Sequence, residues 1–140
     1  MKSIKTTLAA LLLTAAILPF ISCKKGEPAI DSRSVMEKLS GKWKLQSSVY
    51  DRFYSGVSHS MTYTGTAADY ADFRSDGRIY SFIDKSYDTS VFDLITATKI
   101  YIDTFTNAFD ITLTDVSLKL YQKQFLTGGD YNESTVNLTR

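Results

Sequence analysis

The chain has 140 residues, which is enough for one domain, and its 16 basic and 15 acidic side chains leave a formal charge of +1. Such a balance lacks the basic field that nucleic-acid binding requires. One Cys excludes a disulfide framework or a thiolate zinc site, and one His argues against a His-based catalytic or metal cluster. No nucleophile elbow or paired-Glu arrangement is present. We therefore expect a protein that is not an enzyme and holds no metal or cofactor.

The first 22 residues have the anatomy of an export signal. Lys2 and Lys5 precede an apolar stretch over residues 8–21, interrupted by Thr14 and Pro19. As a helix this stretch would span roughly 21 Å, less than the roughly 30 Å hydrocarbon core of a bilayer. A removable signal peptide over residues 1–22 is therefore favoured over a permanent transmembrane helix.

Residues 18–23, which read Leu-Pro-Phe-Ile-Ser-Cys, resemble the signal of bacterial lipoproteins, with Phe20 in place of the usual Leu, as in Bacteroidetes-type envelopes. The resemblance implies cleavage before Cys23 and attachment of lipid, such as palmitate, to that residue. Several acyl chains would hold the protein at a membrane of the cell envelope. We expect the outer membrane, with the periplasmic or surface side left open. The alternative is a secreted protein with an incidental cysteine.

Removal of the signal would leave 118 residues (140 − 22) with a formal charge of −1 (14 − 15). Residues 23–33 are mostly small, charged or Pro and show no apolar periodicity, so we expect a flexible linker. The domain proper, residues 34–140, is expected to open with a short helix. Ser34 and Glu37 match the S-x-x-E capping box and Gly41 is a suitable terminator, which predicts a helix over residues 35–40.

Beyond this helix, apolar and polar residues alternate with the period of a β-strand. Trp43, Leu45 and Val49 share one parity and are expected on one buried face. The alternation recurs along the chain, between turn signals such as Asp76-Gly77 and Gly128-Gly129. No second helical pattern follows, so the strands must be antiparallel.

Residues 42–140 number 99, which gives eight strands of about 12 residues each with their connections. We therefore predict an all-β fold, an antiparallel eight-stranded up-and-down β-barrel with a short N-terminal helix. Closure would remove the edges that an open, aromatic-rich sheet would expose. A β-sandwich of seven or eight strands fits the same length and is the alternative.

The order of these elements resembles the lipocalins, and more specifically the lipocalin-like lipoprotein domains of Bacteroidetes. Three segments carry the resemblance: residues 39–45 with the G-x-W opening Gly41-Lys42-Trp43, residues 72–77, and residues 113–120. In lipocalins the Trp closes the barrel floor and an Arg from the last strand lies across its ring. The resemblance assigns these positions to Gly41, Trp43 and Arg140, and the alternative for Arg140 is a solvated side chain.

The resemblance also implies a small apolar ligand that enters at the mouth opposite Trp43, with Tyr54, Tyr63 and Tyr131 as rim residues. The domain holds 17 of the 18 aromatic residues, so its barrel is either hollow or filled by its own side chains. Two functions stay open: a tethered module that binds a small apolar molecule, or a non-enzymatic envelope interaction or scaffold protein with a filled barrel. The expected partners are the membrane, through Cys23, and that ligand; we expect a monomer that binds no nucleic acid.

Overall fold

One antiparallel sheet that closes on itself dominates the computed structural model, which describes residues 32–103 and 107–140. Its elements, in chain order, are α1 (Ser32–Leu39), β1 (Gly41–Tyr54), β2 (Val57–Thr64), β3 (Tyr70–Phe73), β4 (Arg78–Ile83), β5 (Ser86–Thr96), β6 (Lys99–Ile102), β7 (Phe109–Leu113), β8 (Ser117–Phe125), the 3₁₀ turn η1 (Thr127–Gly129) and β9 (Tyr131–Thr139). The all-β prediction with one short helix is confirmed.

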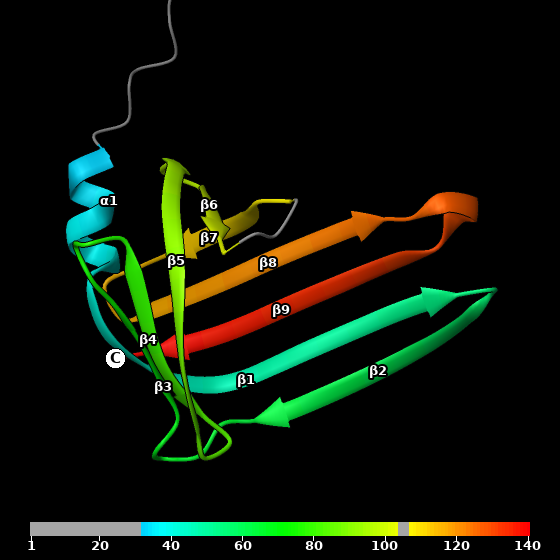
Figure 1. Cartoon of the computed structure of the whole chain (residues 1–140), viewed down its shortest axis with the longest axis horizontal. Coiled ribbons are helices and arrows are strands. Elements are labelled where there is room, and N and C mark those ends of the chain that lie inside the picture. Colours follow the sequence, from blue (N-terminus) through cyan, green and yellow to red (C-terminus); the bar gives the residue numbers. More distant parts are fainter. Residues whose placement is uncertain (1–31, 104–106) are drawn as a thin grey trace, which may run out of the picture.

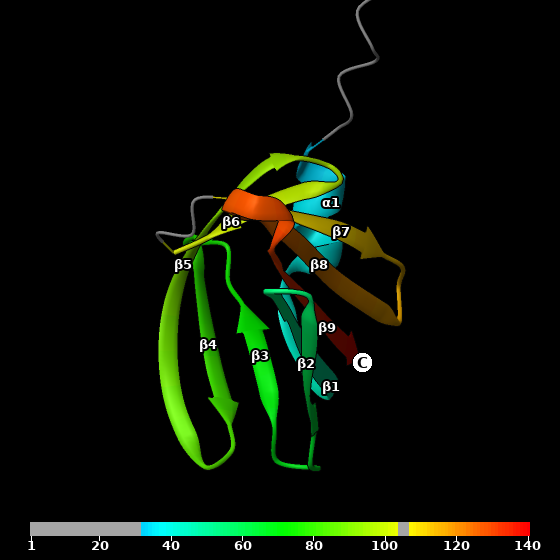
Figure 2. The same ribbon diagram turned by 90° about the vertical axis from the view of Figure 1, so that its right-hand side faces the viewer.

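Eight of the strands form the barrel, in the order β1-β3-β4-β5-β6-β7-β8-β9, and a β9–β1 pairing closes it. Every pairing is antiparallel, as the absence of crossover helices requires. Figure 2 shows the strands arranged in a ring. The β-sandwich alternative is therefore wrong, because one continuous sheet encloses the core. The barrel is compatible with a calycin-like fold.

The helix α1 covers one end of the barrel (Figure 1). It begins three residues before the predicted start and ends at Leu39, whose side chain is fully buried. Gly41 follows with a φ of +111°, a conformation that L side chains rarely adopt, which explains why a glycine ends the helix.

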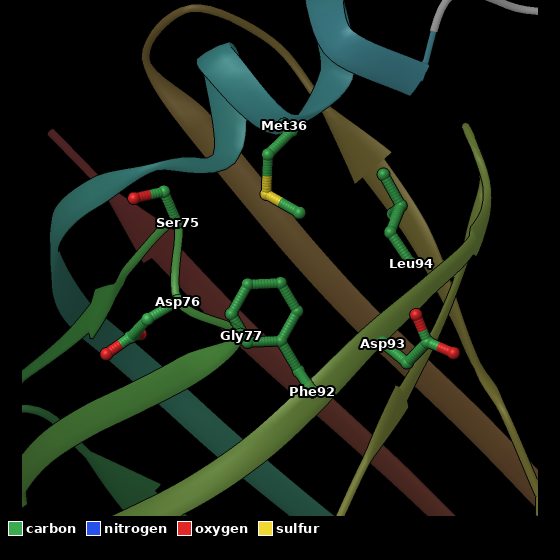
Figure 3. Close-up of a pocket in the computed structure, with 7 residues that line it drawn as sticks. All are labelled: Met36, Ser75, Asp76, Gly77, Phe92, Asp93 and Leu94. Carbon is green, nitrogen blue, oxygen red and sulfur yellow. The ribbon is translucent and has the colours of Figure 1, made fainter.

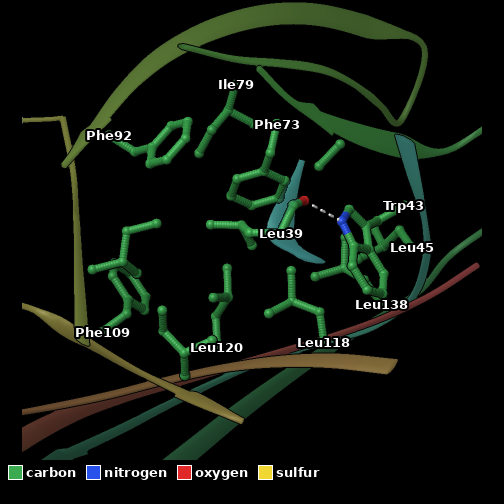
Figure 4. Packing of buried hydrophobic residues seen from close by; sticks show 13 residues of the cluster. Leu39, Trp43, Leu45, Phe73, Ile79, Phe92, Phe109, Leu118, Leu120 and Leu138 are labelled. Atoms are coloured by element: carbon green, nitrogen blue, oxygen red, sulfur yellow. Dashed lines mark hydrogen bonds between the residues drawn. The ribbon is translucent and has the colours of Figure 1, made fainter. Parts of the chain in front are cut away.

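The buried apolar side chains gather at this end of the barrel (Figure 4). Trp43 lies among them, and its indole Nε1 donates a hydrogen bond of 2.8 Å to the carbonyl oxygen of Leu39. The remaining members of the core come from every barrel strand: Leu45, Ala71, Phe73, Ile79, Phe92, Ile100, Phe109, Ile111, Leu118, Leu120 and Leu138. Burial of each large side chain is worth about 1.5–3 kcal/mol, so this end of the barrel is the stable part of the fold.

At the other end, four strands extend together beyond the core (Figure 1). We call them the projecting sheet: β2, residues 47–54 of β1, residues 131–135 of β9 and residues 121–125 of β8, in the order β2-β1-β9-β8. Its two hairpin ends are joined where the backbone N–H of Ser55 donates to Oδ1 of Asp130 at 3.0 Å.

A β-bulge separates the two parts of β1. The register with β9 shifts between Leu45, which faces Leu138, and Ser47, which faces Asn137, so Gln46 is the extra residue. The prediction that Val49 shares the face of Trp43 and Leu45 is therefore wrong. The bulge reverses the parity, and Val49 lies on the outer face of the sheet.

Strand β2 is the ninth strand, and the sequence did not reveal it. Its sequence is mostly polar and does not show the alternation of a half-buried strand, yet it pairs along its whole length with β1. Most of its side chains are exposed, because the projecting sheet has solvent on both faces. Without a buried face there is no alternation of hydrophobicity to detect.

Candidate functional site

The inner face of the projecting sheet continues the inner face of the barrel. Past the bulge, Ser48 faces Val136 on β9, on the side where Leu45 faces Leu138. Alternate residues of β1 beyond this point, Tyr50, Arg52 and Tyr54, therefore lie on that inner face.

Strand β2 adds residues opposite Tyr50, Arg52 and Tyr54 to this face, since directly opposite residues share a side of an antiparallel sheet. Met61 faces Tyr50, His59 faces Arg52, and Val57 faces Tyr54. Neither the Ser/Thr-rich sequence of β2 nor the parity of β1 predicted this set, because the bulge and the hairpin create it.

Five of these residues line a hollow of about 500 Å³: Tyr50, Arg52, Tyr54, His59 and Met61. Tyr54 is 53% exposed and Met61 is 65% exposed. Large apolar side chains that gather in solvent around one concavity are typical of a binding surface. We call this concavity the mouth groove.

The mouth groove contains one permanent positive charge. The guanidinium carbon of Arg52 lies 5.2 Å from the ring centre of Tyr54, so the cation stands beside an aromatic ring. Two tyrosine rings and a methionine provide apolar contact area, and a guanidinium binds carboxylate or phosphate groups. This arrangement suits a small molecule with a mainly apolar body and an acidic group.

Two further hollows flank α1 at the opposite end. One, of about 450 Å³, has Met36, Phe92 and Leu94 as its apolar part and the carboxylates of Asp76 and Asp93 on its polar side (Figure 3). The other, of about 440 Å³, is lined by Val35, Lys38, Ala97, Thr98, Ile111, Thr112 and Leu113. Neither of these hollows includes a Tyr, Trp or Arg side chain, so the mouth groove is the better candidate.

The three predicted rim tyrosines are not brought together. Tyr54 lines the mouth groove. Tyr63 lies on the inner face nearer the core, half-buried, with its hydroxyl donating to Asp69 Oδ2 at 2.8 Å. Tyr131 lies on the outer face, stacked on Phe53 with ring centres 5.3 Å apart. Alternation along the sequence does not show that the bulge exchanges the inner and outer residues of β1. The sequence therefore could not tell which of these tyrosines faces the groove.

The residues assigned to the barrel floor lie in contact. The guanidinium carbon of Arg140 is 4.0 Å from the ring centre of Trp43. One guanidinium nitrogen of Arg140 donates to the carbonyl oxygens of Lys38 and Ser40, each at 2.6 Å. These carbonyls belong to the end of α1, where no further turn satisfies them, so Arg140 caps the helix as well as covering the ring.

Asp69 is a structural residue that sequence reasoning missed. It is 2% exposed, and its carboxylate accepts from the N–H of Thr66 at 2.6 Å, the hydroxyl of Tyr63 and the N–H of Asp84 at 3.0 Å. The hydrogen bond from Thr66, supported by those from Tyr63 and Asp84, outweighs desolvation and lowers the pKa of Asp69 to about 2. The spacing of Thr66 and Asp69 is a turn signature that could have indicated it. Its role is to join the β2–β3 and β4–β5 connections.

Within residues 32–103 and 107–140, no three His, Cys, Asp or Glu side chains are grouped so that they could hold a metal ion. None of the helices in this part of the chain has the length and apolar character needed to cross a membrane. The predicted signal peptide, Cys23 and almost all of the predicted linker lie outside the described residues.

Comparison with known proteins adds no relative. A scan against protein-family models found no match, and neither did a search of curated proteins or a search of solved structures.

Proposed function

We propose that this protein is an envelope-anchored, lipocalin-like lipoprotein that binds, without catalysis, a small and largely apolar molecule at the open end of its barrel. The observation that carries the binding proposal is the mouth groove, where Tyr50, Tyr54 and Met61 surround a hollow of about 500 Å³. Pockets for small ligands commonly enclose about 300–1,000 Å³. The anchoring proposal rests on residues 18–23 and their resemblance to a lipoprotein signal of Bacteroidetes type.

The division of the protein into two ends supports this function. Buried side chains fill the barrel near α1, while the residues of the mouth groove lie on strands that extend past that core. A ligand at the groove would cover tyrosine and methionine surface without disturbing the packed end. Arg52 would face any acidic group on the ligand, and His59 stands directly opposite Arg52.

The first experiment is native mass spectrometry of the full chain purified from its own envelope. We expect a co-purifying small molecule that is mainly apolar and carries a carboxylate or phosphate. Repeated preparations that contain no such molecule would contradict ligand carriage.

The second experiment measures the affinity of that molecule for two variants by calorimetry. Tyr54→Ala removes a groove ring, and we expect binding to weaken about tenfold, which corresponds to about 1.4 kcal/mol. Tyr101→Ala, which truncates an exposed tyrosine of β6 outside the groove, is the matched control and should bind as the parent does. Equal affinities for both variants would place the ligand elsewhere.

A second candidate function is that of a non-enzymatic envelope interaction or scaffold protein. It is favoured by the packed barrel near α1 and by Phe125, which is 74% exposed at the far end of the projecting sheet and is followed in the chain by the exposed Leu126. Cross-linking in intact envelopes distinguishes the two candidates. A scaffold would capture a defined protein partner that Phe125→Ser releases, whereas a carrier would not.

A further inference from the structure

Strand β2 presents an unpaired edge. Among the described strands it pairs with β1 alone, so the hydrogen-bonding groups that point away from β1 have no strand partner. Proteins usually protect such an edge with charged residues, proline or a covering element, because a bare edge pairs with other chains. The sequence of β2, Val-Ser-His-Ser-Met-Thr-Tyr-Thr, contains no Lys, Arg, Asp, Glu or Pro.

Two other strand segments of four or more residues in the described chain also pair on one side only, but each of them contains a charged residue. Residues 86–90 of β5 pair with β4 and contain Asp88. Residues 122–125 of β8 pair with β9 and contain Lys123, which forms an ion pair of 3.0 Å with Glu133. Both segments therefore contain a charge that discourages pairing with a foreign strand, and β2 has none.

We propose that β2 pairs antiparallel with β2 of a second copy of this chain, so that two projecting sheets become one continuous eight-stranded sheet. A two-fold axis perpendicular to the sheet keeps the inner faces of both copies on one side. The proposed dimer differs from the monomer that was expected from the sequence.

The composition of β2 favours a second copy of this chain as the partner, because each β2 residue then lies opposite a β2 residue of the other copy. An uncharged strand meets an uncharged strand, so no like charges oppose each other. With the axis at Met61, Met61 opposes Met61 and His59 opposes Tyr63 on the inner face. The methionine, 65% exposed in one copy, then becomes covered.

The pairing also changes the mouth groove. Met61 and His59 line the hollow from its β2 side, which is the side that the second copy approaches. The two grooves of the dimer therefore adjoin across the axis, and Met61 of the second copy extends the apolar wall of each. The pairing itself needs no ligand, so its test is independent of ligand carriage.

Sedimentation velocity of the full chain in a mild detergent tests the association. Met61→Lys places two ammonium groups opposite each other at the axis, and we expect the dimer to dissociate at least about tenfold more readily. Val116→Lys is the matched control, because Val116 is also 65% exposed but lies in the β7–β8 turn. A parent chain that stays monomeric at about 100 µM, where even a weak dimer with a Kd of about 10 µM would be populated, overturns the proposal. Equal dissociation by the two variants also overturns it.

Disulfide trapping tests the register and does not depend on the stability of a charged variant. Opposed Cα atoms of antiparallel strands lie about 4.5–5.5 Å apart, within the range that a disulfide spans, so Met61→Cys should link to itself. In the same register the two copies of Ser58 are about 20 Å apart, so Ser58→Cys should not. Peptide mass analysis identifies the linked residues. Linkage of Ser58→Cys that equals or exceeds that of Met61→Cys rules out this pairing.

Discussion

Removal of the Arg140 side chain should destabilise the domain at the end covered by α1. The guanidinium lies 4.0 Å from the ring centre of Trp43 and donates to the carbonyl oxygens of Lys38 and Ser40. Arg140→Ala loses all three contacts at once. It also leaves the last carbonyls of the helix to water alone and uncovers one side of a buried indole.

The magnitude follows from these contacts. A partly exposed cation–π contact contributes about 1 kcal/mol. Two hydrogen bonds from a charged donor contribute about 1 kcal/mol each at an exposed site, and a cation at a helix C-terminus contributes about 0.3–1 kcal/mol. We expect a loss of about 3–4 kcal/mol in the free energy of unfolding, which for a domain of this size lowers Tm by roughly 12–16 °C.

Thermal unfolding followed by circular dichroism and by the fluorescence of Trp43 measures this effect. Arg140→Lys keeps the charge but not the planar group, so it should lose about half as much stability. Arg78→Ala is the control, because Arg78 is an exposed arginine at the start of β4 and should change Tm by no more than about 2 °C. If Arg140→Ala unfolds within about 2 °C of the parent, the side chain contributes nothing to the floor and the reasoning fails.

Three further predictions concern the connections around β2. The pKa of Asp69 is lowered from 3.8 to about 2, so its ionised form stabilises the fold at neutral pH, and this contribution is lost as the pH falls from about 5 toward 2. The Tm deficit of Asp69→Asn, measured from pH 7 to pH 2, should shrink over that range, and a constant deficit would contradict the assignment. Tyr63→Phe removes one donor to this carboxylate, and acid titration should show the pKa of Asp69 moving up toward its ordinary value. Gly65→Ala would bring a Cβ to 2.1 Å from the carbonyl oxygen of Leu45 and should lower the free energy of unfolding by denaturant by about 3 kcal/mol. Gly56→Ala is the control, because its Cβ meets open space and only its φ of +80° is unfavourable, so it should cost about 1 kcal/mol. Equal losses for the two variants would refute the clash.

The barrel was predictable because its strands bury one face. Trp43 and Leu45 alternate with charged neighbours, and later pairs such as Leu118 and Leu120 do the same, so a period of two is visible wherever a strand lines the core. The turn at Asp76-Gly77 was also predictable, because Gly77 has a φ of +78° that a glycine adopts without strain. The barrel has the eight strands predicted from chain length, but the same residues also contain the ninth strand, β2, which that prediction did not include.

The mouth groove could be anticipated only in part. Tyr54 was predicted at the rim, but its neighbours Tyr50, Arg52, His59 and Met61 were not. These residues come together because of a bulge that no local sequence pattern predicts and because of a strand, β2, whose polar sequence is typical of a loop. A strand in solvent on both faces leaves no periodic trace, because no burial selects one parity over the other.

The sequence by itself determined the fold class and the approximate position of the short helix, because turn signals, the capping box and the alternation of apolar residues specify them. The floor residues Trp43 and Arg140 were expected only from the resemblance to lipocalins. Only the tertiary structure decided which residues share the inner face, that Asp69 joins two connections, and that β2 keeps a free edge. These properties depend on register and on strand order, which arise from pairing between segments far apart in the chain. A one-residue bulge at Gln46 exchanges the two faces of β1, and that exchange sets the composition of the candidate site.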